Sequence, residues 1–255
     1  AGSFAAAVLL LAIGAGLGAR TARGRWAAGS VGVLALVQVG LSLSRGAWIG
    51  CIAGFLALLI LQRRARRALT RLAPPLLLAL VVAATLTPAA SELQIVGERF
   101  TSIGSADKNP YDDRTTIWGE ALREFHDSPW LGQGPGAFPY VSSRLASRAR
   151  TVSALHAHDL PLHVAAELGG PGVVLVFGFT LSLGFAALRA SRRLNEVDGS
   201  LAAGVGAALA TFVGQGLFDV TLLSALIATL LWFLVGLALA LSVVRPAAEG
   251  GTLPT

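Results

Sequence analysis

Histidines and acids gather just before the fifth apolar stretch of the chain. Asp159, Glu167 and three of the four histidines fall within residues 156–167. Those histidines are His156, His158 and His163. Imidazole titrates near neutral pH, so it commonly serves as a general acid or base. The residue types therefore favour proton-transfer chemistry. A His-x-His pair can also bind a metal, but no cysteine or tight carboxylate cluster accompanies it, so we expect neither a metal nor a cofactor.

A helix should begin inside this stretch. Pro161 suits the first turn, with His158 or Asp159 near the cap. His163 and Glu167 then lie one turn apart on the same face. The run "GGPG" at residues 169–172 should break the helix before an apolar span begins at Val173. Because broken helices at membrane depth must be buried in protein or line a wet cavity, we expect these groups to face a polar cavity.

Two arginines stand out from the other basic residues. Arg45, in "LSLSRGAW", lies at the end of the second apolar stretch, where it either snorkels to the interface or serves a site. A guanidinium binds phosphate bidentately, which lysine cannot do. Arg114 begins a predicted helix and adds a second candidate cation. Its alternative role is a surface pair with Asp112 or Glu120.

The stretch "SPWLGQGPGAFPY" at residues 128–140 is rich in turn formers. It is no phosphate loop of the Walker type, because it lacks the Gly-Lys-Ser/Thr ending. Tight turns are one interpretation of its glycines. The other is close backbone approach to a substrate, for which Gly134 and Gly136 are the candidates.

The composition indicates an integral membrane protein. Of the 255 residues, 54% are hydrophobic and only 13% are charged, against about 25% charged in soluble domains. A bilayer-spanning helix needs roughly 20 apolar residues. About seven such stretches are present: Phe4–Ala19, Trp26–Leu43, Ala47–Leu61, Pro74–Ala90, Val173–Leu188, Leu201–Phe218 and Leu222–Leu241. The sequence thus predicts an all-α, polytopic helix bundle.

Arginines in alternate connections predict the orientation. Twelve of the twenty basic residues lie in connections that alternate along the chain and should be cytoplasmic by the positive-inside rule. They are Arg20, Arg23, Arg25, Arg63, Arg64, Arg66, Arg67, Arg71, Arg189, Arg192, Arg193 and Arg245. This divides the chain into four spans (1–90), a long outer, periplasmic loop (91–157), three spans with a broken outer helix (158–244) and a cytoplasmic tail (245–255). The basic charge therefore fixes topology and indicates no nucleic-acid binding.

The long loop should contain an amphipathic helix ending near Asp127. Asp112 or Asp113 can cap its start. One face carries Ile117, Trp118, Ala121, Leu122 and Phe125. We expect that face to lie on the membrane or on the bundle.

Several motifs, in order, resemble the O-antigen ligase and polymerase family of bacterial membrane glycosyltransferases. The first is "SRGAW" at 44–48, followed by Arg114, Trp118 and the glycine-rich stretch through Phe138. The next motif is His158-Asp159, which is separated by nine residues from Gly169; Gly172 follows after two more residues. Ligases of the family carry Asn, Ser or Gln after that histidine, so Asp159 departs from the ligase pattern. The "FD…W…G" of Phe218, Asp219, Trp232 and Gly236 fits the family's last helices.

This resemblance implies transfer of a glycan from an undecaprenyl-diphosphate carrier to a hydroxyl of a glycan, lipid or protein, at the outer face of the bacterial inner membrane. In that hypothesis His158 is the base and Arg45 and Arg114 stabilise the departing diphosphate. Asp159, Glu167, His156, Gly134 and Gly136 contact substrate or orient the histidine. The family also implies inversion and independence from metals. Two alternatives stay open: a transporter for a small anion such as bicarbonate, and a non-catalytic scaffold.

Overall fold

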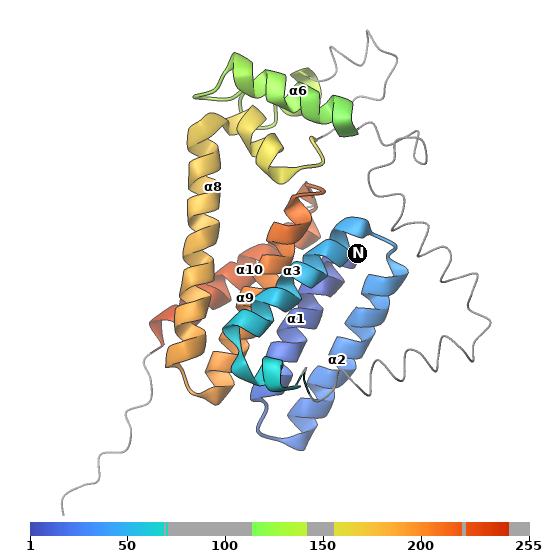
Figure 1. The fold of residues 1–255 in the computed structure, drawn as a ribbon, viewed down its shortest axis with the longest axis vertical. Coiled ribbons are helices and arrows are strands. Elements are labelled where there is room, and N and C mark those ends of the chain that lie inside the picture. Colours follow the sequence, from blue (N-terminus) through green and yellow to red (C-terminus); the bar gives the residue numbers. More distant parts are fainter. Residues whose placement is uncertain (69, 71–113, 142–155, 221–222, 245–255) are drawn as a thin grey trace, which may run out of the picture.

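The computed structural model describes residues 1–68, 70, 114–141, 156–220 and 223–244 (Figure 1). These residues form helices and their connections, and no strand occurs among them. The helices are α1 (Gly2–Gly18), α2 (Ala22–Leu41), α3 (Arg45–Leu61), α6 (Arg114–Asp127), α8 (Leu160–Arg193), α9 (Glu196–Gly216) and α10 (Ala225–Val243). The all-α prediction is thereby confirmed for the part of the chain that is described.

Four helices are long and apolar enough to cross a membrane, namely α2, α8, α9 and α10. The expected spans 4–19 and 47–61 correspond to α1 and α3, which are apolar but have 17 residues each. The expected span 74–90 lies outside the described residues. A multi-pass helical membrane protein is therefore established, and the total of seven spans stays a prediction.

α9 is the central helix of the bundle and packs against α1, α3, α8 and α10. Small residues make this possible, because they let helix backbones approach closely. Gly204 of α9 lies against Gly14 of α1, where neither glycine has room for a side chain. Similarly, a Cβ on Gly54 of α3 would lie 2.7 Å from the Ala207 carbonyl oxygen. Close packing thus fixes α9 and the residues that follow it.

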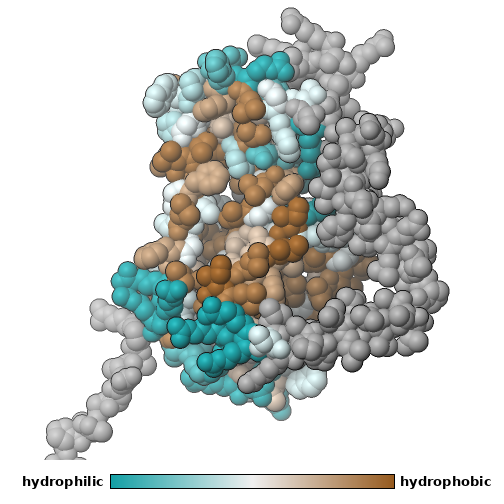
Figure 2. Space-filling model, in the orientation of Figure 1, coloured by the Kyte–Doolittle hydropathy of each residue, from teal (hydrophilic) through white to brown (hydrophobic). Residues whose placement is uncertain are grey.

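The two ends of the bundle differ in character. The α1–α2 and α8–α9 connections lie at one end, where hydrophilic residues gather in Figure 2, whereas hydrophobic residues cover the middle of the visible face. At the same end Arg64, just after α3, forms an ion pair with Glu196 at the start of α9. The starts of α3 and α8 lie at the other end, and α6 crosses above them (Figure 1). The basic connections therefore share one end as far as their residues are described.

α8 is broken at Gly169, as the sequence predicts. Gly169 has φ 67° and ψ −170°, while the residues after it, including Pro171, are helical. The break is thus narrower than the expected 169–172. The segment after α6 binds the backbone groups that it frees: Gln133 N donates to Ala166 O (2.8 Å), and Gly170 N donates to Pro129 O (2.7 Å). The break is accordingly stabilised by protein contacts.

Candidate active site

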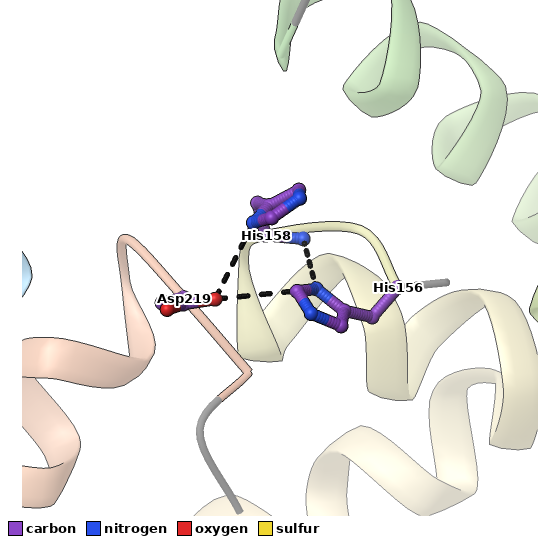
Figure 3. Close-up of side chains that lie close together, drawn as sticks. All are labelled: His156, His158 and Asp219. Carbon is purple, nitrogen blue, oxygen red and sulfur yellow. Dashed lines mark hydrogen bonds and ion pairs between the residues drawn. The ribbon is translucent and has the colours of Figure 1, made fainter. Parts of the chain in front are cut away.

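A histidine and an aspartate face each other at the end of the bundle that α6 covers. His158 Nδ1 lies 3.3 Å from Asp219 Oδ1 (Figure 3). His158 precedes α8 and has φ 51°, a left-handed conformation that is unusual for a residue with a side chain. Asp219 follows α9, and its Oδ1 also accepts from Val220 N at 2.9 Å. Two residues that are 61 positions apart in the chain therefore form one acid–histidine pair.

His156 completes this cluster. Its Nδ1 lies 4.0 Å from Asp219 Oδ1 and accepts from His158 N at 3.3 Å. Burial lowers the pKa of His156 and the neighbouring His158 lowers it further, although Asp219 acts in the opposite direction. Burial raises the pKa of Asp219, but the hydrogen bond from His158 and the adjacent charges outweigh it, so that pKa lies below its usual value. Asp219 is therefore a carboxylate at neutral pH.

Both predicted arginines border the same connection between α9 and α10. Arg114, the first residue of α6, donates from Nη1 to Phe218 O at 3.1 Å. Arg45 is the first residue of α3, whose N-cap Ser44 accepts from Ala47 N at 3.3 Å. A Cβ added to its neighbour Gly46 would lie 3.7 Å from Phe218 Cβ. Arg45 and Arg114 thus begin their helices beside Phe218, next to the His158–Asp219 pair.

The cluster has the composition of a metal site. One atom each of His156, His158 and Asp219 lies within 4.8 Å of the others. Tetrahedral zinc with ligands at about 2.1 Å has ligand–ligand separations of roughly 3.4 Å, close to the 3.3 Å between His158 and Asp219. The positive charge of Arg114 acts on His156 and opposes a cation there. The expectation of no metal remains a prediction.

A second acid–histidine pair is buried beneath α6. His163 Nε2 lies 3.7 Å from Glu167 Oε2, so the two residues share a face of α8 as predicted. The Glu167 carboxylate accepts from Gly136 N (2.9 Å) and Phe138 N (3.2 Å), and the Phe138 ring meets His163 edge-on at 5.5 Å between centroids. Glu167 therefore holds the glycine-rich loop against α8.

The remaining predicted residues have local structural roles. Asp159 caps α8 by accepting from Leu162 N at 2.8 Å. Burial raises the pKa of Asp159, and that hydrogen bond partly offsets the rise. Gly134 and Gly136 have φ of 103° and 74°, so their turns require glycine. No neighbour lies within 4 Å of a Cβ built on either, and contact of these glycines with substrate stays a prediction.

Only part of the predicted apolar face of α6 is covered by protein, and its placement on the membrane or on the bundle stays a prediction. Ala121 is buried as expected and packs with Phe138, and Ile117 packs on the same cluster. Leu122, however, is 53% exposed, while Glu120 and Glu124 are buried. Burial raises the pKa of Glu124 to about 7, and the charges of Glu120 and Glu167 add to the shift. The predicted cap, Asp112 or Asp113, lies outside the described residues.

Sequence reasoning did not place Asp219 in the site. It assigned the orienting role to Asp159 or Glu167, which are close to the histidines along the chain. A signal was present, because Asp219 is the acid in a short, otherwise uncharged connection between two apolar stretches. Charged groups at membrane depth are costly and usually functional.

These features define a multi-pass helical membrane protein with an Arg–His–Asp site at one end of its bundle. The sequence profile of the O-antigen ligases matches residues 30–177, more than half of the chain. The chain therefore belongs to the O-antigen ligase family. The matched region includes Arg45, Arg114 and His158, whereas Asp219 lies beyond it. A comparison with curated proteins finds no match.

Family membership establishes the coarse activity. The chain is a bacterial membrane protein of ligase and glycosyltransferase type, and its substrates are, in general, a lipid-linked glycan and an acceptor. This favours group transfer over the transporter alternative.

Proposed function

We propose that the protein transfers a glycan from an undecaprenyl-diphosphate-linked donor to an acceptor hydroxyl, at the periplasmic face of the inner membrane. The observation that carries this proposal is the His158–Asp219 pair, 3.3 Å apart, beside the segment that Arg114 binds through Phe218 O. A base for a hydroxyl and cations for a departing diphosphate are the two groups that such a transfer needs.

The donor leaves as an anion, and the two arginines suit it. As the acceptor oxygen bonds to the anomeric carbon, the bond from that carbon to the diphosphate oxygen breaks. Negative charge then develops on the diphosphate. Arg45 and Arg114 stabilise it, since guanidinium groups bind phosphate oxygens bidentately. One direct displacement inverts the anomeric centre.

The histidine removes the proton of the acceptor. With His158 Nδ1 donating to Asp219, the other ring nitrogen, Nε2, carries the lone pair and accepts the hydroxyl proton. Asp219 fixes that tautomer and stabilises the imidazolium that forms, the arrangement seen in acid–histidine pairs of hydrolases. Asp219 takes the orienting role that the sequence analysis gave to Asp159 or Glu167, because Asp219 is the acid that faces His158. Asp159 caps α8, and Glu167 lies beside His163 and binds the glycine-rich loop.

The periplasmic placement is supported by charge. The arginines in the connections at one end of the bundle should be cytoplasmic, and the His158–Asp219 pair lies at the other end. ATP and sugar nucleotides are scarce outside the cytoplasm. A donor that arrives already activated on a lipid diphosphate suits that side.

Substitution of the base tests the proposal. In His158→Ala, transfer from a purified lipid-diphosphate glycan to its acceptor should fall by about 10²–10⁴-fold, the usual contribution of general-base assistance. The full protein is assayed in proteoliposomes with EDTA present, and protein abundance is measured alongside.

His126→Ala is the matched control, because His126 is exposed on α6 and should be nearly silent. Activity that survives in His158→Ala removes His158 as the base. If EDTA abolishes wild-type activity, transfer depends on a metal, and the His156–His158–Asp219 cluster becomes the candidate site for it.

A further inference from the structure

Two large apolar side chains project from the turn that follows α6. Trp130 is 77% exposed and Leu131 is 81% exposed, and the two are adjacent. A single exposed leucine is ordinary, but a neighbouring Trp–Leu pair at a turn calls for a partner. We call residues 130–131 the Trp130–Leu131 tip.

The backbone of the tip is fixed to the outer end of the long helix. Gly170 N donates to Pro129 O at 2.7 Å, and Gly132 N closes the turn on Ser128 O at 2.8 Å. A Cβ on Gly169 would lie 2.7 Å from the Trp130 carbonyl carbon. The backbone of the tip is therefore held against α8 at Gly169 and Gly170.

An apolar, exposed stripe of α8 begins at the same point. Val174, Leu175, Leu181 and Phe185 are 71%, 72%, 73% and 63% exposed, respectively, and their spacing places them on one side of the helix. Such a side in a membrane protein faces lipid. The tip is bound at Gly170, four residues before this stripe begins. Figure 2 shows hydrophobic residues reaching up to the part of the molecule beneath α6.

The length of α8 places the tip at a definite depth. The basic residues near the end of α8, on the side predicted to be cytoplasmic, begin with Arg189. From Arg189 to Gly170, which binds the tip, nineteen residues rise roughly 28 Å at about 1.5 Å each. The hydrocarbon core of a bilayer is about 30 Å thick. With Arg189 at the inner boundary, the tip lies at the outer one, the level at which tryptophan is enriched.

We infer that the Trp130–Leu131 tip inserts into the outer boundary between lipid headgroups and acyl chains and anchors α6 to the bilayer. The anchor fixes the height of α6 and of the His158 turn beneath it. That this height matches the level of a lipid diphosphate rests on the proposed function, whereas the contact with bulk lipid does not.

Depth measurement by spin labelling tests the anchor. In the full chain with Cys51→Ala, Trp130→Cys is labelled with a nitroxide, and the protein is placed in liposomes of phosphatidylethanolamine and phosphatidylglycerol. Collision with oxygen, which concentrates in lipid, is compared with collision with a water-soluble nickel chelate. The control is His126→Cys, on the exposed side of α6.

The oxygen-to-nickel ratio should be several-fold higher at position 130 than at 126. Leu131→Cys, which leaves Trp130 in place, should give the same result and covers the case in which loss of Trp130 disturbs the turn. Equal ratios at 126 and at both tip positions would overturn the inference. It also fails if the ratio rises only when a lipid-diphosphate donor is added, because the tip then binds the donor. Neither reading depends on transfer activity.

Discussion

The protein contains two acid–histidine pairs of similar spacing and different surroundings. His158 and Asp219 lie 3.3 Å apart and are each more than one-third exposed. His163 and Glu167 lie 3.7 Å apart and are about one-tenth exposed. In the first pair the carboxylate faces an accessible imidazole, whereas in the second it binds the N–H groups of Gly136 and Phe138.

The difference shows that accessibility, more than residue type, separates a reactive pair from a structural one. A substrate hydroxyl can reach the ring of His158. The same hydroxyl would have to displace the glycine-rich loop to reach His163, because Phe138 is fully buried against it. The two pairs therefore predict different kinds of defect when they are altered.

After loss of the base, the largest fall in transfer activity is expected from a change at Arg45, which begins α3 near the His158–Asp219 pair. Arg45→Lys keeps the charge but removes the planar fork, so transfer should fall on the order of 10²-fold, the cost of losing one donor to a developing anion. Transfer is measured in proteoliposomes at equal protein abundance. Arg123→Lys, on the exposed side of α6, is the control. Near-normal activity in Arg45→Lys would leave only a point-charge role for this residue.

Asp219→Asn should come next. Asp→Asn behind a buried catalytic histidine lowers turnover by about 10⁴-fold. Because His158 and Asp219 are each more than one-third exposed, water can take over part of the orienting role. We therefore expect the turnover number to fall less, roughly 10-fold or more, with little change in the KM for donor. Asp219→Glu should restore part of the rate because it keeps the carboxylate. Asp127→Asn, at the exposed end of α6, serves as the matched control. If Asp219→Asn changed only the KM or the protein yield, Asp219 would not orient the base.

Glu167→Gln should affect stability more than turnover. Its amide group would face a backbone N–H that now donates to a carboxylate oxygen, which costs about 1–3 kcal/mol. The melting temperature in detergent should fall, while the turnover number per folded molecule should exceed that of Asp219→Asn. Glu196→Gln is the control, because its pair with Arg64 is exposed and worth at most about 1 kcal/mol. A turnover defect as large as that of Asp219→Asn would erase the distinction between the two pairs.

Much of the fold could be predicted from the sequence because membrane helices depend on local composition. Apolar length identified α2, α9 and α10 within a few residues, and the Gly169 break followed from the glycines and Pro171. The predictions on residues 74–90 and on the cap of α6 lie outside the described residues.

The site was harder to predict because its parts are distant in the chain. The histidines were evident, but the acid that faces His158 comes from the far end of α9, and no local pattern reports that packing. Likewise, the residue types of α6 did not indicate that Glu120 and Glu124 are buried by protein while Leu122 is exposed. The side of α6 that is buried is the side that packs against the glycine-rich stretch and against the part of α8 before Gly169.

The smallest effect on transfer should come from Glu124, which is 2% exposed and lies outside the His158–Asp219 site. Both of its carboxylate oxygens lack a hydrogen-bond partner among the described residues. Its pKa is about 7 in the folded protein against 4.5 ordinarily, so between these pH values the folded state binds more protons than the unfolded state. The stability that protonated Glu124 confers on the α6 region should therefore be full below pH ~4.5, decline as pH rises, and reach its minimum above pH ~7.

Hydrogen exchange of the α6 amides between pH 5 and 8, corrected for intrinsic rates, should show this decline in the wild type. Glu124→Gln is neutral throughout and should flatten the profile, whereas Glu196→Gln should leave it unchanged. If the exchange rates of the wild type do not change with pH, Glu124 does not titrate in this range and does not control the stability of α6.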